Sequence, residues 1–516
     1  MKEIENIQEA IENNRLFREK MLSDPYRPRY HFAIPEGIGM PGDPNGAFYA
    51  NGRYHLMYLY DCNADKYRWG HMSSVDLLHW RSHPDALMPD DLDGGIFSGG
   101  AFADDSGTVY LSYWALPRDG AGGIRIAYSN DVENHYEKWE KSDGYAIKCT
   151  EGGILEIQGE NGEKQFLCCS DPSNIWKKDG VYYMQAGNLP VLNKFRNDEA
   201  APKYYRGDWT DLFFSIDMKN WEYLDRFYQR DINNEWTDES EDDMCPSFLP
   251  LPDTKEGGQS DKYLQLFISH NKGCQYYIGA YDKNNNVFIP EKHGRMSWND
   301  NAFFAPEALT DKNGRQIMWS WLTDNPPNEL ERGWSGVYGL PRALWLGAEG
   351  DLGMAPISEL EKLRYNHANT FDVNYGNSCE IKIVIDMKSA AKAGVKVRCA
   401  PDGSEYTSIY YDRSKNQIIF DETKSGAQGS SVKGPFCQTV PSQIEAAPFV
   451  LKGFEFLSMN IFIDNSVVEV FVNERQAITR RVYNKRKDSK GIKLFSEGDI
   501  DIVSLDVWEI APTNFY

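Results

Sequence analysis

Beyond Pro28 the chain is a succession of short apolar segments separated by polar turns. The segments are rich in Tyr, Phe, Val and Ile, and the turns between them are Asn-Gly, Asp-Gly or Ser-Gly pairs. Such pairs suit two-residue hairpin turns, so the pattern predicts antiparallel strands joined in chain order. Ahead of them, Ile4, Ile7 and Ile11 recur among charged residues, which predicts one amphipathic helix over residues 1 to about 22.

One strand–turn–strand pattern recurs along the first two thirds of the chain. Asp43 stands eight residues before an Asn-Gly turn at 51–52, and Asp171 stands eight residues before an Asp-Gly turn at 179–180. Looser copies begin near residues 98, 245 and 305. Repeated four-stranded units are typical of a β-propeller, and these starts predict five blades whose innermost strands point into one central funnel.

The pattern changes near residue 350. Residues 357–363 predict a short helical connector, and a hairpin over 461–472 belongs to later strands that lack the repeat, as expected of an antiparallel sandwich. We therefore expect an all-β chain, namely a five-bladed β-propeller followed by a C-terminal β-sandwich, with a short N-terminal helix. The expected divisions are a helical extension at 1–30, the propeller at 31–350, a linker helix at 351–369 and the sandwich at 370–516.

Charge and composition limit the classes of partner that this chain is expected to bind. The 516 residues include 55 Lys and Arg against 77 Asp and Glu, a net charge of −22, which disfavours binding to a nucleic-acid backbone. No apolar run approaches the roughly 18 residues that a membrane-spanning helix needs. We expect neither nucleic acid nor a membrane as a partner, and the sequence leaves the oligomeric state open.

The cysteines and the amino terminus indicate the cellular compartment of the protein. The nine Cys show no paired metal-like spacing, and residues 1–5 lack the apolar region of a signal peptide. Both features favour a cytoplasmic protein with free thiols, although a secreted form whose signal has been removed gives the same sequence. The nine His show no clustered ligand spacing either, so core or surface roles are expected for them and no metal.

The funnel geometry brings together acids that are far apart in the sequence. Asp43, Asp171 and the acids just before Cys245 would converge at its centre. Two carboxyl groups in a concave, aromatic-lined site are the usual means of cleaving a glycosidic bond, one acting at the anomeric carbon and one protonating the leaving oxygen. Because Asp43 and Asp171 stand at equivalent repeat positions beside Pro, we favour a catalytic role over turn capping for both.

Six short motifs occur in a fixed order between about residues 30 and 510. They are Asp43-Pro44-Asn45-Gly46; Trp69-Gly70-His71 with Ser74, Asp76 and Trp80; Phe97-Ser98-Gly99; Asp171-Pro172; Cys245-Pro246; and Asp464-Asn465-Ser466-Val467-Val468-Glu469-Val470-Phe471. In this order they resemble glycoside hydrolase family 32, the invertase, inulinase and levanase group.

The resemblance implies a retaining hydrolase of β-fructofuranosides such as sucrose-type oligosaccharides, levan or inulin. It implies Asp43 as the nucleophile and Asp171 as the residue that stabilises the transition state. It also implies that Trp69, Phe97, Ser98 and a Trp of the fifth blade, taken as Trp321, line the fructose pocket. No metal or organic cofactor is expected, because two carboxyls carry the chemistry.

The acid/base is the main departure from the family pattern. The family usually has a Glu directly before the Cys, and this chain has Met244 there. In an extended strand, residues 241, 243 and 245 share one face, so Glu241 or Asp243 would reach the funnel. A branch of the family with its Glu four residues before the Cys favours Glu241, with Asp243 as the alternative.

Further departures indicate a divergent branch. Gly42 stands where the common pattern has Asn, Leu59 where it has Gln, and Ser170 where it has Arg. These changes concern substrate choice more than reaction type. Glu307 occupies the funnel position of the fifth blade, where it either binds a sugar hydroxyl or takes a buried, hydrogen-bonded place.

Three other functions remain open at this stage. The same scaffold would transfer fructose if a sugar hydroxyl replaced water as the acceptor. A relation to five-bladed arabinan-cleaving enzymes would predict inversion, although the motif at 464–471 argues against it. Finally, Met244 in place of the usual Glu motivates a non-catalytic, fructan-binding propeller.

Overall fold

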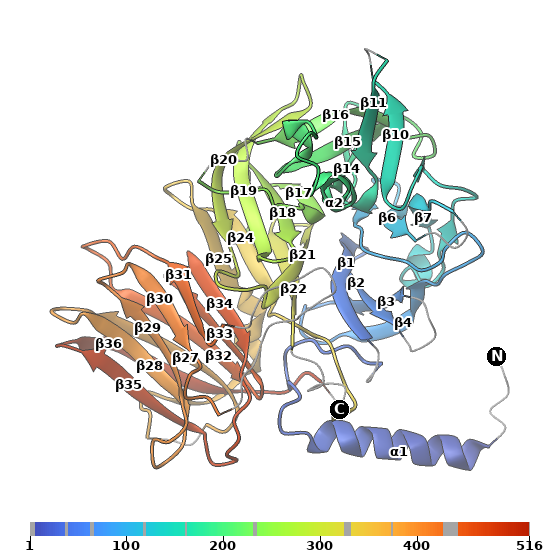
Figure 1. Ribbon diagram of the computed structural model, residues 1–516. Coiled ribbons are helices and arrows are strands. Elements are labelled where there is room, and N and C mark those ends of the chain that lie inside the picture. Colours follow the sequence, from blue (N-terminus) through green and yellow to red (C-terminus); the bar gives the residue numbers. More distant parts are fainter. Residues whose placement is uncertain are drawn as a thin grey trace.

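The computed structural model is built almost entirely of β-strands (Figure 1). It describes residues 6–36, 40–61, 67–116, 120–159, 162–230, 235–324, 332–372, 375–426 and 442–514. All paired neighbouring strands in these ranges are antiparallel, as the hairpin pattern predicts. The all-β class expected from the sequence is confirmed.

The predicted N-terminal helix is present as α1 (Ile7–Ser23). Asn6 caps it by accepting a hydrogen bond from the Glu9 amide at 3.2 Å, an arrangement that satisfies an otherwise unpaired N–H of the first turn. The helix extends along one side of the body, with its N-terminal end furthest away (Figure 1). Only its carboxy-terminal part is packed, because Met21 is buried while Ile7 and Ile11 are exposed.

Five sheets follow one another between residues 40 and 356 of the described chain. The first contains β1 (Met40–Ala50), β2 (Arg53–Asp61), β3 (Tyr67–Ser74) and β4 (Arg81–Leu87). The second contains β5 (Ala101–Ala103), β6 (Val109–Ala115), β7 (Gly123–Ser129), β8 (Glu140–Lys141) and β9 (Ile147–Lys148). A separate hairpin, β10 (Ile154–Gln158) and β11 (Lys164–Cys168), leads to the third sheet.

The other three sheets repeat this order with small insertions. The third contains β12 (Ser170–Pro172), β13 (Trp176–Lys178), β14 (Val181–Gly187), β15 (Trp209–Ser215) and β16 (Glu222–Gln229), with α2 (Leu189–Phe195) between β14 and β15. The fourth contains β17 (Met244–Pro250), β18 (Tyr263–Ser269), β19 (Gly273–Asp282) and β20 (Val287–Arg295). The fifth contains β21 (Phe303–Thr310), β22 (Gln316–Leu322), β23 (Val337–Tyr338), β24 (Arg342–Leu346) and β25 (Leu352–Pro356). Short 3-10 helices are η1 (Val132–Asn134), η2 (Lys203–Tyr205) and η3 (Ser358–Leu363).

The five sheets contact one another in a closed order. β1 contacts β5, β12 contacts β6 and β17, β17 contacts β21, and β21 returns to β1. In Figure 1 the labelled first strands β1, β17 and β21 lie near one another in the middle of the view. Each hairpin start expected from the sequence lies in, or just before, one of these first strands.

The first strands share a local irregularity. Their pairing register shifts near the start of β1, β12, β17 and β21, which marks a β-bulge in each. Directly before a Pro, Asp171, Cys245 and Ala305 have positive φ angles of 39°, 50° and 50°. Non-glycine residues seldom adopt this backbone, and bulges of this kind redirect a side chain out of the alternating pattern of a strand.

The remaining strands form two sheets around a second core. One has the order β26 (Arg364–Ala368), β36 (Asp501–Ile510), β27 (Ser378–Asp386), β32 (Leu457–Asp464), β33 (Val467–Val472) and β34 (Gln476–Arg481). The other has the order β31 (Ile444–Pro448), β30 (Gln417–Asp421), β29 (Thr407–Asp412), β28 (Lys392–Cys399) and β35 (Gly491–Glu497). Ile381, Ile383 and Ile385 lie fully buried between them.

A buried ionic network joins these sheets to the rest of the chain. The His31 ring lies 2.9 Å from Asp464 and 3.0 Å from Glu469, and Glu469 also accepts from Arg342 at 2.9 Å. Burial opposes these charges, but Asp464 and Glu469 raise the pKa of His31, and His31 and Arg342 lower the pKa of Glu469. The sequence motif at 464–471 therefore serves to hold the two parts together.

Cysteine pairing differs from the sequence-based expectation. Cys149 and Cys169 form a disulfide, so the expectation of free thiols is wrong for these two residues. The sequence did not reveal the pair because the two Cys are 20 positions apart, at the two ends of the segment that carries the β10–β11 hairpin. Cys168, Cys245, Cys274, Cys379 and Cys399 are free thiols, as expected.

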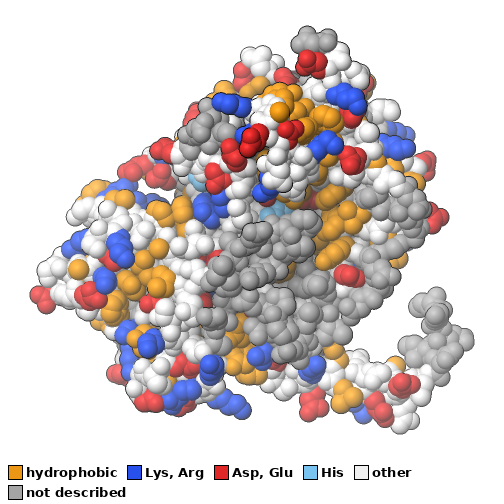
Figure 2. All heavy atoms as spheres, in the orientation of Figure 1, with side chains coloured by type: hydrophobic (Ala, Val, Ile, Leu, Met, Phe, Trp, Pro, Cys, Tyr) orange, Lys and Arg blue, Asp and Glu red, His pale blue; other side chains and the backbone are white. Residues whose placement is uncertain are grey.

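The surface mixes charges of both signs. On the face shown in Figure 2, basic and acidic side chains alternate, and apolar side chains gather in patches near its top and middle. Among the helices that the structure describes, none is long and apolar enough to cross a bilayer.

Several histidines gather inside the first sheet. His55 Nδ1 lies 2.9 Å from His71 Nε2, and the rings of His71 and His83 stack at 4.4 Å. Burial lowers the pKa of His55 and of His71 well below 6.5, and neighbouring His charges lower both further. Both rings are therefore neutral in the folded protein at pH values where a solvated His is protonated.

This cluster predicts an acid-sensitive fold. Because the folded-state pKa values are depressed, stability is complete above about pH 6.5 and falls below it, by about 1.4 kcal/mol per pH unit for each histidine. We expect His55→Gln to reduce this slope when the free energy of unfolding is measured by urea denaturation between pH 7 and 5. The same change at the exposed His79 is the control, and an unchanged slope in His55→Gln would contradict the account.

Candidate active site

The first strands of three sheets bring two carboxyl groups to one thiol. Asp43 lies in β1, Asp171 in β12 and Cys245 in β17. The Cys245 thiol lies 3.5 Å from Asp43 Oδ2 and 3.6 Å from Asp171 Oδ2, positioned to donate to either. The convergence expected for Asp43, Asp171 and the start of β17 is therefore present in the structure.

The loop before β5 completes the surroundings of Asp43. Ser98 Oγ donates to Asp43 Oδ2 at 2.5 Å. Asn45 fixes the same loop, because its side chain accepts from the Gly99 amide at 3.0 Å and donates to the Asp43 carbonyl at 2.9 Å. A Cβ on Gly99 would lie only 2.0 Å from the Ser112 carbonyl oxygen and one on Gly100 only 2.3 Å from the Asn174 nitrogen, so the Gly pair lets this loop pack closely against β6 and the segment after β12.

Burial controls the charge of the two carboxyls. It raises the pKa of Asp171, and the charge of Asp43 raises it further, to about 7, against the lowering effects of His270 and Cys245. Burial also raises the pKa of Asp43, although hydrogen bonds from Ser98 and Cys245 and the charge of His270 oppose the shift. Two neighbouring acids with raised pKa values are more typical of functional sites than of surface positions.

Two polar atoms of the expected site residues have no partner within the described chain. Asp171 Oδ1 and Trp321 Nε1 are both buried and make no hydrogen bond there. An unsatisfied buried group costs about 1–3 kcal/mol, so such atoms are expected where a ligand supplies the missing partner. One is an acceptor and the other a donor, a combination suited to hydroxyl groups.

Aromatic side chains border the same region. Trp321 packs against Phe304, with ring centroids 6.1 Å apart at 85°, and Cys245 packs against the same cluster of buried residues. Phe97, which is partly exposed, lies between Tyr67 at 5.3 Å and Trp114 at 5.4 Å. Of these residues, Ser98 contacts Asp43 directly and Phe97 precedes it in the chain; that Phe97, Ser98 and Trp321 line a fructose pocket stays a prediction.

Two other expected lining residues lie behind the surface. Trp69 is fully buried, and its indole N–H donates to the Phe97 carbonyl at 3.1 Å, so it supports Phe97 from below. Glu307 is also buried; it accepts from the Ala47 amide at 2.6 Å, and burial raises its pKa to about 8. For Glu307 the structure supports the buried, hydrogen-bonded alternative.

The acids before Cys245 do not share one face. Residues 241–243 precede β17 and are not part of a strand, and both Asp243 and Cys245 have positive φ angles, of 44° and 50°. Strand alternation therefore does not apply to them, and the argument that placed Glu241 and Asp243 in the funnel fails. Their three side chains go to three different sets of partners.

The side chains of Glu241 and Asp243 both bind other groups inside the protein. The fully buried Glu241 carboxylate forms an ion pair with Lys272, accepts from Ser269 and accepts from Gln275 at 2.8 Å. Asp243 Oδ2 accepts from Asn188 at 3.2 Å and from the Trp209 amide at 3.0 Å, in the third sheet. Burial and the neighbouring charges of Asp208 and Glu241 raise the pKa of Asp243.

Asp242 connects instead to His270, in the turn after β18. Its Oδ2 accepts from the His270 amide at 2.9 Å and from His270 Nδ1 at 3.2 Å. The ring of His270 meets Phe304 edge-on, with centroids 5.7 Å apart, and 21% of its side chain is exposed. Sequence reasoning missed His270. The available signal was its position directly after the second strand of a repeat, because the loop there lies at the end of the sheet where the first strand begins.

The departures from the family pattern contact each other in pairs. Ser170 Oγ lies 3.9 Å from the Met244 sulfur, where the common pattern has Arg and Glu. A Cβ on Gly42 would lie 3.0 Å from Leu59, where the common pattern has Asn and Gln. In each pair, two departures from the common pattern lie next to each other in this chain.

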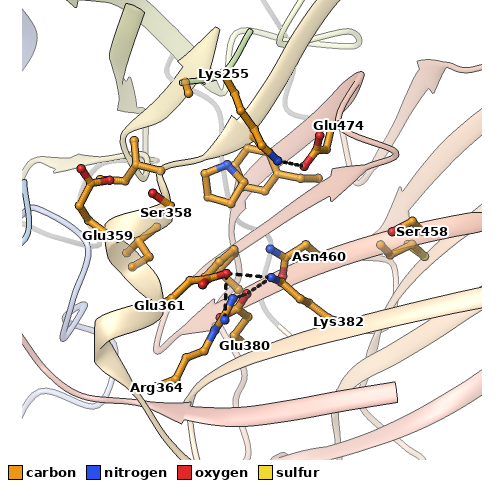
Figure 3. Close-up of a pocket in the computed structure, with 18 of the residues that line it drawn as sticks. Lys255, Ser358, Glu359, Glu361, Arg364, Glu380, Lys382, Ser458, Asn460 and Glu474 are labelled. Carbon is orange, nitrogen blue, oxygen red and sulfur yellow. Dashed lines mark hydrogen bonds and ion pairs between the residues drawn. The ribbon is translucent and has the colours of Figure 1, made fainter. Parts of the chain in front are cut away.

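A cavity lies between the fifth sheet and the carboxy-terminal sheets, and neither Asp43 nor Asp171 lines it (Figure 3). It has a volume of about 530 Å3. Its charged side chains pair with one another: Lys255 with Glu474 at 2.9 Å, and Glu361 with Arg364 at 3.0 Å. Within the described chain, no three His, Cys, Asp or Glu side chains gather in a way that would hold a metal ion.

The geometry predicts a structural role for Glu241. Replacing it with Gln removes the buried partner of the Lys272 ammonium, which then keeps, among its ion pairs in the described chain, only the exposed Asp238 at 3.0 Å, so we expect a loss of about 1–3 kcal/mol in the free energy of unfolding. The double variant Glu241→Gln with Lys272→Met should recover much of this loss, since no charge is left unpaired. Urea denaturation measures both variants, and full stability of Glu241→Gln would contradict the buried ion pair.

Comparisons with known proteins identify the family of this chain. Residues 31–356 match the family model described as Glycosyl hydrolases family 32 N-terminal domain, and residues 358–509 match Glycosyl hydrolases family 32 C terminal. The chain is similar to the sucrose-6-phosphate hydrolase of Zymomonas mobilis, with 27% identity over 99% of this chain and 97% of that protein.

Two further relatives come from plants. Fructan 1-exohydrolase w3 of Triticum aestivum is 27% identical over 79% of this chain and 66% of that protein. The crystal structure of fructan 1-exohydrolase IIa from Cichorium intybus has a similar fold, with a TM-score of 0.76 at 20% identity over 95% of this chain and 98% of that one. Since the family models match nearly all of residues 31–509, in line with the motifs around Asp43, Asp171 and Cys245, the chain belongs to glycosyl hydrolase family 32.

Proposed function

We propose that this chain is a retaining β-fructofuranosidase built on a five-bladed β-propeller with a β-sandwich behind it. The closed order of contacts among the five sheets supports the propeller. The names of the relatives, sucrose-6-phosphate hydrolase and fructan 1-exohydrolase, support hydrolysis of a fructosyl bond. The substrates proposed are terminal β-D-fructofuranosides, in sucrose-type oligosaccharides or in fructans such as levan and inulin.

One observation carries the proposal: two desolvated carboxyls converge on Cys245, and Asp171 Oδ1 has no partner within the described chain. Asp43 is the proposed nucleophile, because it is the more exposed of the two and so the more accessible to an anomeric carbon. The hydroxyl of Ser98 holds Asp43 Oδ2, which fixes the orientation of the carboxylate for attack by Oδ1.

Asp171 is the proposed stabiliser of the transition state. Its unpaired Oδ1 would accept a hydrogen bond from a ring hydroxyl as positive charge develops on the sugar. Trp321 Nε1 would donate to another hydroxyl, and Phe97 would cover the apolar face of the ring. The proposed chemistry needs only side chains of this chain and water.

The test is fructose release from sucrose, inulin and levan, with Asp43→Asn and Asp171→Asn beside the native protein. We expect release by the native protein and a loss of at least about 10³-fold in kcat for Asp43→Asn, because the amide cannot form the fructosyl ester. Asp171→Asn should lose kcat more than it raises KM, since its interaction strengthens in the transition state.

Asp179→Asn is the matched control, because it lies in the hairpin turn of the same sheet, where Asn-Gly serves as well as Asp-Gly. It should retain native activity. If the native protein binds these sugars but releases no fructose from any of them, the hydrolase proposal is wrong and a fructan-binding function takes its place.

A further inference from the structure

We propose that His270, oriented by Asp242, is the acid and base of this enzyme: it protonates the leaving oxygen and then activates the attacking water. The inference rests on the proposed fructosidase reaction and deepens it. It assigns the proton-transfer role that the sequence places at Glu241 or Asp243 to a residue of a different type, on the neighbouring hairpin.

The usual position of the proton donor holds a side chain that cannot titrate. Met244 is 1% exposed and packs its sulfur against the Ser170 hydroxyl at 3.9 Å. Ser170, which stands where the common pattern has a charged Arg, also holds a side chain that does not titrate near neutral pH. A proton donor for the leaving group must therefore come from elsewhere.

The other acids of this segment are unsuitable for that task. Glu241 is fully buried and held by Lys272, Ser269 and Gln275. Asp243 is also fully buried, and its Oδ2 is bonded into the third sheet. A general acid must reach its substrate within hydrogen-bond distance, and neither carboxyl has surface through which to do so.

His270 is held as an oriented imidazole. Asp242 Oδ2 accepts from both the backbone amide and the ring Nδ1 of His270, so it fixes the ring and identifies Nδ1 as a donor. Phe304 packs edge-on against the ring at 5.7 Å, and Asn301 donates to the His270 carbonyl at 3.0 Å. Where an imidazole transfers protons through one ring nitrogen, a carboxylate commonly orients the ring through the other nitrogen. Here Asp242 binds Nδ1, so Nε2 is the nitrogen assigned to proton transfer.

The carboxyls of the site favour the protonated form of the His270 ring. Burial lowers the pKa of His270, but the carboxyls of Asp242, Asp171 and Asp43 outweigh it, so that the net shift is upward. Conversely, the positive ring lowers the pKa of Asp43 and of Asp171. The three groups therefore form one electrostatic unit, in which an acid faces a nucleophile of opposite charge.

Two other groups of the site fit the role less well. Burial and the two adjacent carboxyls raise the pKa of the Cys245 thiol, which makes it a poor acid at neutral pH. Asp171 is only 6% exposed and shares the thiol with Asp43, so it lies on the nucleophile side of the sugar. The His270 side chain is 21% exposed, so it is more accessible than Asp171, Glu241 or Asp243.

The proton balance closes with water as the only co-reactant. In the first step an Asp43 oxygen bonds the anomeric carbon, the bond to the leaving oxygen breaks, and the proton on His270 Nε2 moves to that oxygen. The ring is then neutral. In the second step Nε2 takes a proton from water as the water oxygen bonds the anomeric carbon, which releases the Asp43 carboxylate and fructose and restores the charged ring.

The test compares His270→Gln on two substrates that differ in their need for a proton. Sucrose requires protonation of its leaving alcohol, whereas p-nitrophenyl β-D-fructofuranoside releases a stable anion. We expect kcat/KM to fall by about 10²–10⁴-fold on sucrose and by less than about tenfold on the nitrophenyl substrate. Added azide, an anionic nucleophile that needs no base, should restore turnover of the nitrophenyl substrate and yield fructosyl azide.

A second variant keeps the test independent of how well His270→Gln folds. Asp242→Asn preserves a hydrogen-bonding group but removes the charge that favours the protonated ring, so the alkaline limb of kcat/KM on sucrose should move to lower pH. The control is His367→Gln, the same substitution at an exposed residue paired with Asp506 in the carboxy-terminal sheets. It should match the native protein on both substrates.

The outcomes separate this inference from the proposed function. Equal losses on sucrose and on the nitrophenyl substrate in His270→Gln would overturn the acid/base role, as would undiminished activity on sucrose or an unmoved alkaline limb in Asp242→Asn. If the native protein itself cleaves neither substrate, the fructosidase proposal fails first, and this inference fails with it.

Discussion

The structure depends on holding two carboxyl groups next to each other away from water. An unpaired carboxylate in such a place is strongly unfavourable, and two together add mutual repulsion. The chain meets this cost with a thiol between Asp43 and Asp171, a hydroxyl from Ser98 and the charge of His270. Each of these groups comes from a different sheet or loop, so the pair exists only when the sheets have closed around it.

The backbone conformation at the start of the first strands serves the same constraint. Asp171, Cys245 and Ala305 adopt positive φ angles directly before Pro, in bulges that take their side chains out of strand alternation. Strain of this kind persists only where the surroundings enforce it. Here Glu307 contributes by binding the Ala47 amide across β21 and β1, and the network around Glu469 fixes the fifth sheet against the carboxy-terminal sheets.

Much of this arrangement follows from the sequence, because repeat spacing is a property of the chain. The eight-residue interval from Asp43 and Asp171 to their turns was enough to predict the sheets and the convergence of both acids. Side-chain direction before Cys245 was not predictable, since alternation assumes an extended backbone and the bulge breaks it. For the same reason His270 was missed: its importance comes from Asp242, whose orientation no periodic pattern encodes.

The central claim is that Asp43 attacks the sugar, and mass analysis of a quenched reaction tests it most directly. The native protein, mixed with p-nitrophenyl β-D-fructofuranoside and stopped in acid during turnover, should yield a peptide containing Asp43 that carries the mass of one fructosyl unit. The same experiment on Asp43→Asn should give no labelled peptide. A fructosyl group on a different residue, or turnover without any labelled peptide, would contradict the account.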